Sequence, residues 1–459
     1  MTGTTSSGRA SLPTANSTKS YWHRDPSKVL FGHRTTPSLP TKADVVIIGS
    51  GISGASAAHF LHENEKGKDL DIVMLEAREA CWGATGRNGG HCQPMLYSAL
   101  PEVGAFELRN YQTLEALIKK HNIPCDWRAF PAAMPVWTPT SKLVKVITKD
   151  SQNPSLSDLR IPTAAGAFLQ ANAASLWPYK LVSWMLETLL SSNKQAVGNF
   201  NLQTNTPVTH LQNIDGKSWI VHTPRGMIAT DRVLLTTNAY TSHLLPKFGD
   251  LIVPVRGEMS ALIPPASMSP ASSTHKPLEH TYVFIGHGKQ NINQDDYLVQ
   301  RPFAAENVKK DGGGELMFGG GRSYAANAGL GVSDDSSIDD PAAAYLRREL
   351  NIVLDLQNKD HELEATWEWS GIMGYSRDGH PWVGEVGEYL GGAKGLFVCA
   401  GFTGHGMPNT CLSAKAAVDI MLGADEVDVP ECYKISRERV ERARALDEVA
   451  VADAKGIML

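Results

Sequence analysis

Short apolar runs, each followed by a glycine-rich turn, organise the first eighty residues of the chain. Residues 44–48 (DVVII) are β-branched and apolar, which is typical of a strand buried on both faces. The turn GSGISG at 49–54 leads into ASAAHFLHEN, which predicts a helix, and DIVMLEAR at 71–78 predicts a second strand. The pattern is therefore strand, GxGxxG turn, helix and second strand.

This arrangement predicts a dinucleotide site. Gly49 permits the tight turn, Gly51 lets the backbone approach a pyrophosphate, and Gly54 lets the helix pack closely on the strand. The helix N-terminus offers N–H groups and a positive dipole end to the phosphates. Glu76, 22 residues after Gly54, is suited to the ribose hydroxyls and would repel a 2′-phosphate, so NADP is disfavoured. The predicted contacts are Gly49, Gly51, Ile52, Ser53, Gly54, Glu76, Ala77 and Arg78.

The loop that follows the second strand separates NAD from FAD. Residues 83–90 (GATGRNGG) predict a loop, because Gly89 and Gly90 do not propagate a helix cheaply. Beside an anchored nucleotide, this loop can bring backbone N–H groups and the side chains of Arg87 and Asn88 against a flat ring. That favours a flavin, although a plain surface loop is the alternative. The predicted cofactor contacts are Thr85, Gly86, Arg87, Asn88, Gly89 and Gly90.

A second glycine-rich loop occurs late in the chain. Residues 396–400 (LFVCA) predict a buried strand, 401–407 (GFTGHGM) a loop, and the following residues a helix that is capped by Asn409 or Thr410 and ends at Gly423. A helix N-terminus directed at a flavin pyrimidine would stabilise the negative charge that develops on reduction. His405 is expected to face the isoalloxazine or the substrate, with a structural hydrogen bond as the alternative. The predicted contacts are Gly401, Gly404, His405, Gly406 and Met407.

Composition narrows the possible partners. The 459 residues are 42% hydrophobic and 20% charged, which suggests two or more domains, and the net charge of -5 favours neither nucleic acid nor an anionic membrane. Six scattered cysteines without CxxC or Cys/His spacing predict reduced thiols and no metal. The Ser/Thr-rich N-terminus lacks an apolar signal core and predicts a disordered tail. No apolar run of 18 residues occurs, so we expect a cytoplasmic protein.

Three motifs together resemble one known family. ADVVIIGSGISGASAA, LEAREACWGATGRNGGH and GLFVCAGFTGHGMPNT are similar to segments of the FAD-dependent amine and amino-acid oxidoreductases, which include D-amino-acid oxidase, glycine oxidase and sarcosine oxidase. The WGATGRNGG loop is most similar to that of the γ-glutamylputrescine oxidases. The resemblance implies an α/β fold in which a Rossmann-type FAD-binding domain is interleaved with a β-rich α+β substrate domain.

The resemblance also implies a division of the chain. It places an N-terminal tail at 1–40, a discontinuous FAD-binding domain at 41–105, 161–250 and 365–425, a substrate domain at 106–160 and 251–364, and a C-terminal helix at 426–459. Val208 is expected near the adenine, and Asn238 at the exit of a strand within 232–241. Segment 253–259 is expected to cross into the substrate domain. The glycine cluster at 311–322 predicts a β-hairpin, and the charged stretch 436–450 a solvated helix.

Two departures from the family pattern concern chemistry. The family's W-x-G-L-R-P-x-T-x-D-G-x-P stretch, whose arginine grips a substrate carboxylate, aligns with WSGIMGYSRDGHP at 369–381 and places Met373 at the arginine position. Simple α-amino acids are therefore not the expected substrates, unless Arg256 or Arg322 replaces the lost contact. Met317 occupies the position of a lysine that activates oxygen in some relatives. Gly371 or Ile372 stands where others attach FAD through a cysteine, so non-covalent FAD is expected.

The resemblance implies oxidation of the C–N bond of a neutral amine. Hydride would pass to flavin N5, the imine would hydrolyse, and O2 would reoxidise the flavin to give peroxide. A flavin dehydrogenase with another acceptor and a tailoring oxidase of a larger nitrogenous metabolite are the alternatives. A non-catalytic flavoprotein is disfavoured, because both flavin loops look intact. The candidate catalytic residues are His405 and Tyr375, and the candidate substrate residues are Met373, Arg256, Gln93 and Tyr97.

Overall fold

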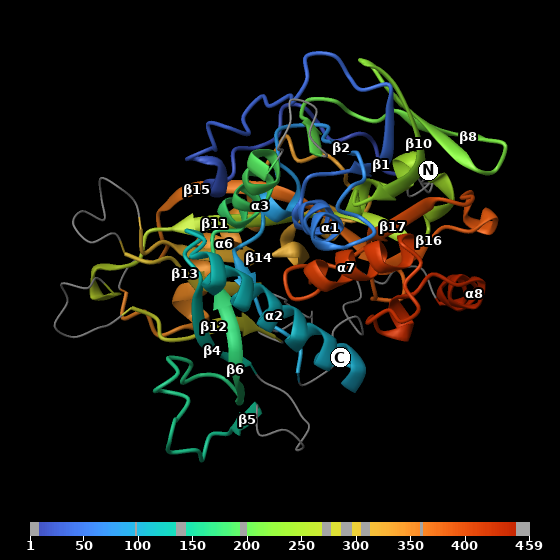
Figure 1. Cartoon of the computed structure of the whole chain (residues 1–459). Helices are drawn as coiled ribbons and strands as arrows, with labels where there is room; N and C mark the ends of the chain where they lie inside the picture. Colours follow the sequence, from blue (N-terminus) through green and yellow to red (C-terminus); the bar gives the residue numbers. More distant parts are fainter. Residues whose placement is uncertain are drawn as a thin grey trace, which may run out of the picture.

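The computed structural model describes residues 9–96, 99–134, 144–192, 200–268, 277–285, 296–303, 313–358 and 361–446. Their strands form two sheets, which helices cover (Figure 1). Within these residues, we find no helix whose length and apolar character would let it cross a membrane.

The first sheet contains the buried apolar runs of the sequence, in the order β16-β17-β10-β1-β2-β7. β17, β10, β1, β2 and β7 are parallel, β16 is antiparallel to β17, and the β8–β9 hairpin continues from β10. Alternate residues of β1 pack into different cores, Val45 and Ile47 with the helices and Val46 and Ile48 on the opposite face. The strands are β1 Lys42–Ile48, β2 Ile72–Leu75, β7 Phe200–Gln203, β8 His210–Ile214, β9 Ser218–Thr223, β10 Gly226–Leu235, β16 Trp382–Glu385 and β17 Leu396–Ala400.

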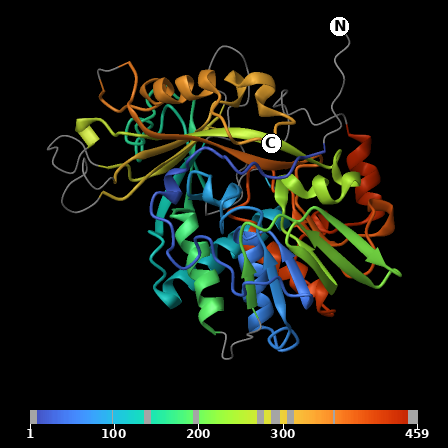
Figure 2. The ribbon, with the colours of Figure 1, turned by 90° about the horizontal axis from the view of Figure 1, so that it is seen from above.

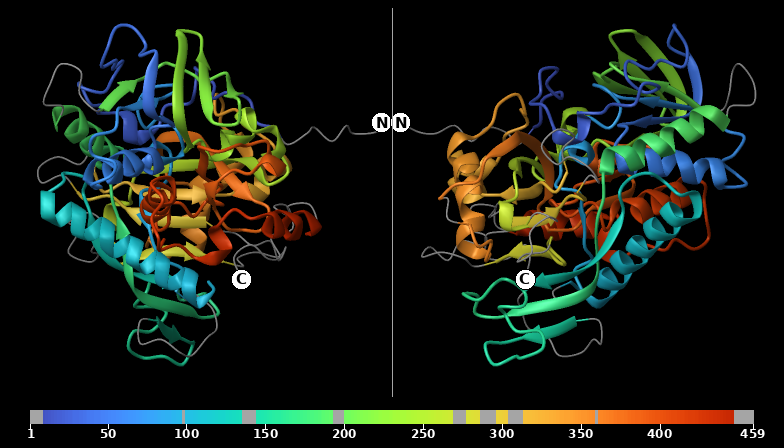
Figure 3. Two further views of the ribbon diagram at one scale, coloured as in Figure 1. Left: turned by 45° about the vertical axis from the view of Figure 1, so that its right-hand side comes forward. Right: turned by 90° about the vertical axis from the view of Figure 1, so that its left-hand side faces the viewer.

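Helices cover one face of this sheet. α1 (Ile52–Glu63) contacts α7 (Thr410–Met421) and α3 (Pro178–Ser192), and all three contribute to the same apolar core. The long helix α2 (Pro101–His121) contacts both α7 and strand β6 of the second sheet (Figure 3). α2 therefore links the two sheets.

The second sheet is mainly antiparallel, in the order β15-β11-β14-β13-β12-β4-β6-β3, with β5 paired to β6. It lies between helix α6 (Asp340–Val353) and the first domain (Figure 2). Leu316 and Phe318 of β14 pack on the α6 side, whereas Met317 packs toward the first domain. The strands are β3 His91–Cys92, β4 Arg128–Met134, β5 Val144–Ile147, β6 Ala167–Ser175, β11 Ile252–Leu262, β12 Thr281–Phe284, β13 Asp296–Gln300, β14 Leu316–Gly320 and β15 Ala365–Ser376.

The interleaved two-domain α/β fold is confirmed, and the strands shift three of the expected boundaries. β3, β6 and β15 lie in segments assigned from sequence to the FAD-binding domain, yet they pair within the second sheet. β15 pairs with β11 from Ile252 to Leu262, so the return to the first domain comes after Ser376, not at 365. The partner of each strand is remote in the sequence, so the pairing leaves no local signal. The β-hairpin expected within 311–322 is not found in the described residues of that cluster, 313–322: residues 316–320 form one strand, β14, which pairs with β11 and β13.

The expectation of a disordered N-terminal tail is wrong for residues 9–40. Tyr21, Trp22 and Leu30 are buried in the main core, and both aromatic rings contact Trp177. Residue Arg34 bridges to β7. Upstream, residues 9–18 are tied to distant loops: Ala10 N–H donates to Ser242 Oγ (2.9 Å), Ser11 N–H to Ser333 Oγ (3.2 Å) and Thr18 N–H to Asp335 O (2.8 Å). In the described part of this segment, Ser11, Ser17, Thr18 and Ser20 all form hydrogen bonds to distant parts of the chain.

The C-terminal helix is shorter and less solvated than expected. α8 spans Arg437–Ala445, and the chain beyond 446 lies outside the described residues. Arg439 is buried, donates to both oxygens of Asp378 (2.8 and 3.0 Å) and lies 3.7 Å from the centre of the Trp382 ring. Charge alternation predicted a solvated face, but a guanidinium stacked on tryptophan and paired with a carboxylate is stable inside.

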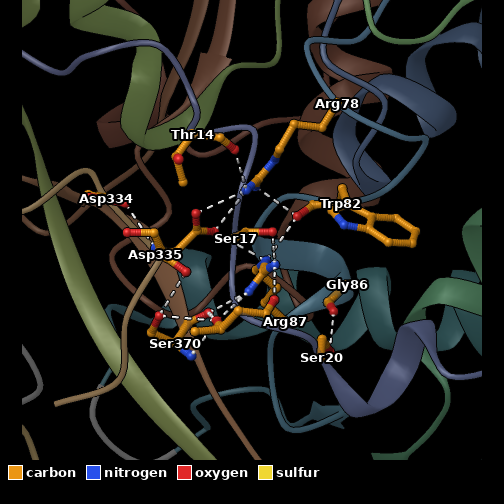
Figure 4. Close-up of polar contacts among 12 residues, drawn as sticks. Thr14, Ser17, Ser20, Arg78, Trp82, Gly86, Arg87, Asp334, Asp335 and Ser370 are labelled. Carbon is orange, nitrogen blue, oxygen red and sulfur yellow. Dashed lines mark hydrogen bonds and ion pairs between the residues drawn. The ribbon is translucent and has the colours of Figure 1, made fainter.

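A buried aspartate joins the N-terminal segment to both domains (Figure 4). Arg78 Nη1 donates to both oxygens of Asp335 (3.0 Å each), and Arg87 Nε lies 3.2 Å from Asp335 Oδ2. The backbone oxygen of Asp335 accepts from Thr18 N (2.8 Å) and from Ser370 Oγ of β15 (3.3 Å). Asp335 is therefore a junction of four chain segments, and its carboxylate offsets two buried positive charges.

We expect Asp335→Asn to lower the free energy of unfolding by about 3–5 kcal/mol, because two guanidinium groups lose their shared buried counter-charge. Chemical denaturation of the variant and the wild type measures this. Asp334→Asn is the matched control, since Asp334 is exposed and, among the described residues, accepts a hydrogen bond from Ser336 N in its own turn and from no other group. Equal losses in the two variants would contradict the role of the junction.

Candidate active site

A cavity of about 320 Å³ lies between the two sheets. It begins at the carboxyl ends of β1, β2 and β10 and continues below β11 and β15 to the loop after β17. The carboxyl ends of parallel strands are where α/β sheets bind ligands. Of the residues predicted from sequence, the cavity is lined by Gly49, Gly51, Ile52, Ser53, Glu76, Ala77, Arg78, Thr85, Arg87, Asn88, Val208, Asn238, Gly404, His405, Gly406, Met407, Met373, Tyr375 and Gln93.

The backbone of the GxGxxG turn has the conformation and close contacts that explain a glycine at each of the three positions. Gly49 has φ +108°, and Gly51 precedes the first residue of α1 in extended conformation. A Cβ at position 54 would lie 2.0 Å from Gly49 O, so Gly54 stands outside the cavity and serves helix–strand packing. At position 51, a Cβ would lie 3.0 Å from Thr85 Oγ1. The backbone at the start of α1 is thus open to a close ligand.

Glu76 is held in one orientation at the end of β2. Its Oε2 accepts from Ser50 N (3.0 Å) and Ser50 Oγ (2.6 Å), and its Oε1 accepts from Arg78 N (2.9 Å). The buried carboxylate therefore borders the cavity, and Ser50, in the turn that follows β1, fixes its orientation. This position is suited to accepting hydrogen bonds from ribose hydroxyls.

Arg87 does not offer its guanidinium to a ring in the cavity, which corrects the expectation from sequence. Nε donates to Trp82 O (3.0 Å), Nη1 to Ser370 O (2.7 Å), and Nη2 to Thr18 O (2.6 Å). The side chain is almost fully buried, and burial lowers its pKa to about 10 despite Asp335. A sequence motif shows that an arginine is present, but not that the surrounding carbonyl groups already occupy it.

The remaining loop residues divide into lining and packing positions. Thr85 Oγ1 accepts from Ile52 N (3.1 Å), which fixes the loop against α1, and Asn88 Oδ1 accepts from Gly90 N (2.7 Å). Gly86, Gly89 and Gly90 are not in the cavity wall. Their missing side chains instead make room for the Cys81 carbonyl, the Tyr297 ring and the Leu176 carbonyl, respectively. These glycines shape the loop without contacting a ligand.

At the far end, Asn238 supports the late glycine loop. Its Oδ1 accepts from Gly401 N (3.0 Å) and Phe402 N (3.3 Å), and it adopts φ +44°. Gly401 (φ +82°) lies outside the cavity wall, whereas Gly404 (φ +74°) lies in it. α7 starts at Thr410 with Asn409 as N-cap residue, as the sequence predicted, so the positive end of the helix dipole lies beside the cavity.

Some of the candidate substrate residues line the cavity and others do not. Met373, Tyr375 and Gln93 line the cavity, whereas Tyr97 lies outside the described residues. Arg256 is not in the wall: it faces Glu258 (3.4 Å) and Asp339 (3.5 Å) on the α6 side of β11. The expectation that Arg256 contacts substrate is therefore wrong, because alternation along β11 directs it away. Arg322 does line the cavity, with its guanidinium 5.0 Å from the centre of the Tyr375 ring.

Several lining residues were not anticipated. Leu12 and Pro13 come from the N-terminal segment, Tyr240 from the turn after β10, and His91 and Tyr297 from the second sheet. No local sequence motif marks them. Burial lowers the pKa of His91 to about 3, with a smaller contribution from His405. His91 is therefore neutral across the physiological range.

The described cavity wall contains histidine and glutamate side chains, but no cysteine and no cluster that could hold a metal ion. None of the described lining residues is a cysteine, and burial raises the pKa of Cys411 to about 11. In the described part of the chain, no three His, Cys, Asp or Glu side chains are placed to hold a metal ion.

The fold and the cavity are those of an enzyme that binds a dinucleotide. The cavity runs across the carboxyl ends of a parallel sheet and is covered by a second, mainly antiparallel sheet. The family of FAD dependent oxidoreductases matches residues 44–420. The chain belongs to this family, whose members act on C–N groups of amines and amino acids. The expected FAD cofactor and oxidoreductase class are thereby confirmed.

Individual relatives agree with this assignment. The chain is 24% identical over 414 residues to the probable oxidoreductase OrdL of Haemophilus influenzae, with 84% of each chain covered. It is 20% identical over 410 residues to the gamma-glutamylputrescine oxidoreductase of Escherichia coli, covering 83% of this chain and 84% of that protein. The crystal structure of glycine oxidase from Geobacillus kaustophilus superposes with a TM-score of 0.65 at 19% identity, covering 86% and 99% of the two chains.

We expect Gly54→Ala to lose bound flavin, because the added Cβ would overlap Gly49 O and push α1 away from β1. The ratio of flavin to protein absorbance in the purified variant measures this. Gly83→Ala is the control: Gly83 lines the cavity, which Gly54 does not, it has a negative φ of -82°, and its added Cβ would meet nothing within 4 Å. Full flavin content in Gly54→Ala would contradict the packing argument.

Glu258 makes the stability of the protein pH-dependent. Burial raises the pKa of Glu258 to about 8 despite the neighbouring Arg256, so the folded protein keeps a proton that the unfolded chain releases above its ordinary pKa. The unfolding free energy of the wild type should therefore fall by up to about 1.4 kcal/mol per pH unit between pH 5 and 8 relative to Glu258→Gln. Denaturant titrations at several pH values test this, and parallel pH profiles of the two proteins would refute it.

Proposed function

We propose that this enzyme oxidises the C–N bond of a small amine that lacks an α-carboxylate at the usual position, with non-covalent FAD as hydride acceptor and O2 as the final oxidant. The imine product would then hydrolyse in water. The similarity to the E. coli gamma-glutamylputrescine oxidoreductase supports an amine as the substrate class. The absence of cysteine from the described cavity wall supports a cofactor held without a covalent thioether.

Met373 is the observation that carries this proposal. It lies on β15 in the cavity wall, where its Cε approaches Gly257 of β11, and a Cβ on Gly404 would lie 3.4 Å from its sulfur. A thioether between two glycines gives a soft apolar surface and no counter-charge at position 373, so a carboxylate could find a cationic partner only further along the described wall, at Arg322 beside Tyr375. A substrate bound against Met373 therefore presents a neutral or apolar group there.

The chain's own residues bind and orient such an amine. Tyr375 and Met373 form one wall, and His405 and Gln93 supply polar groups that can hold the amine nitrogen. Water is limited by the apolar side chains of Met259, Phe402 and Met407, which raises the strength of each polar contact. FAD, when bound, supplies the hydride-accepting chemistry.

A dehydrogenase that passes electrons to another acceptor is the second candidate, and Met317 favours it. Met317 occupies the position at which some relatives carry an oxygen-activating lysine, and its side chain is fully buried in the core between β11 and β13. Oxygen uptake during turnover, compared with reduction of a quinone dye, separates the two candidates.

We expect amines without an α-carboxylate to bleach the flavin absorbance of the wild-type protein under anaerobic conditions, and simple α-amino acids to do so poorly. Met373→Arg should reverse this order, because a guanidinium pairs with carboxylate in two hydrogen bonds. Met373→Leu, which keeps size and polarity, is the matched control and should retain the preference for amines. Bleaching of the wild type by α-amino acids alone would overturn the proposal.

A further inference from the structure

Glu107, a residue without a role in the sequence motifs, lies next to the candidate catalytic histidine. It is on α2 and is almost completely buried, with 2% of its surface exposed. Its Oε2 lies 3.1 Å from His405 Nε2, and His405 lines the cavity with about a quarter of its side chain exposed (26%). A buried carboxylate thus contacts a histidine that a substrate can reach.

The other partners of Glu107 determine which atoms donate. Oε2 also accepts from Met95 N (2.6 Å), and Oε1 accepts from Asn409 Nδ2 (2.8 Å). The orientation of the Asn409 amide is set independently, because Tyr433 OH donates to its Oδ1 (2.7 Å) and its Nδ2 also donates to His405 O (3.0 Å). With a backbone N–H and an amide NH2 as donors, the Glu107 carboxylate acts as an acceptor on both oxygens.

These contacts select one form of His405. An acceptor at 3.1 Å requires the proton on Nε2, so the lone pair of the neutral ring is on Nδ1. We propose that Glu107 is a positioning residue that fixes this tautomer, so that His405 Nδ1 takes the proton from a substrate ammonium and leaves the neutral amine that is oxidised. The carboxylate then stabilises the imidazolium that forms. This inference rests on the proposed amine oxidation.

The remaining titratable groups near the pair do not replace Glu107. His91, on β3, faces His405 but is held neutral by burial. Tyr433 and His380 interact electrostatically with Glu107, and burial raises the pKa of Tyr433 and lowers that of His380. Tyr375 OH lies beside Gly404, in the loop that carries His405. Glu107 is the carboxylate in hydrogen-bond contact with His405 among the described residues.

The test is the pH dependence of anaerobic flavin reduction by an amine identified in the bleaching panel. In Glu107→Gln, the apparent pKa of the rising limb should fall by about one unit, because the imidazolium loses its counter-charge, and the plateau rate should fall at least about tenfold. In a His405→Asn background, Glu107→Gln should have no further effect on the pH profile. An unchanged apparent pKa in Glu107→Gln would overturn the proposal.

Asn110 provides the matched control. It lies one turn further along α2, is fully buried, and holds the same loop through Met407 O (3.1 Å) and Leu412 N (2.9 Å) without contacting His405. Asn110→Ser should loosen the loop and lower the rate while leaving the apparent pKa in place. An equal shift in both variants would show that Glu107 acts only by supporting the loop.

A measurement without substrate keeps the inference separate from the proposed function. The ¹⁵N chemical shifts of the His405 ring, assigned by their loss in His405→Asn, should show a proton on Nε2 in the wild type and a mixture of tautomers in Glu107→Gln. A proton on Nδ1 in the wild type would refute the inference. Failure of every amine to bleach the flavin would instead refute the amine proposal alone, since the tautomer is measured independently.

Discussion

The attraction between one buried carboxylate and two buried guanidinium groups holds the active-site architecture together. Asp335 neutralises part of the charge of Arg78 and Arg87, which would otherwise be costly next to an apolar core. Arg78 lies two residues after Glu76, just beyond the end of β2, and Arg87 belongs to the loop beneath the second sheet. The spacing between the nucleotide end and the ring end of the cavity is thus set by one side chain from the substrate domain.

This junction also explains how two domains that interleave along the chain behave as one unit. Arg87 donates to Ser370 O of β15, and the adjacent Trp369 Nε1 donates back to Arg87 O (2.7 Å). The loop and the strand are therefore locked in both directions by buried hydrogen bonds. Met373 and Tyr375 lie on the same strand, a few residues after Ser370. The hydrogen bonds between Arg87 and β15 therefore fix the position of these two side chains relative to the loop 83–90.

The sequence predicted the elements whose chemistry is local. The GxGxxG turn needs only adjacent residues, and Glu76 and the N-cap of α7 follow from position within a strand or helix. What it could not predict depends on distant neighbours. The sequence analysis proposes both Arg256 and Met373 as substrate residues. Alternation of side chains along the strands directs Arg256 of β11 away from the cavity and Met373 of β15 into it. The motif predicts Arg87 as a ligand-binding group, because two of the carbonyl groups that occupy its guanidinium come from the distant residues 18 and 370. Glu107 gave no signal, since a glutamate on an amphipathic helix normally faces solvent.

The N-terminal segment has a consequence for the order in which the molecule assembles. Residues 10, 11 and 18 bond to residues 242, 333, 335 and 370, so each contact closes a loop of more than two hundred residues. Contacts of such long sequence separation form late in folding. We therefore expect the part of the cavity wall that Leu12 and Pro13 provide to be completed late, after the two sheets have formed.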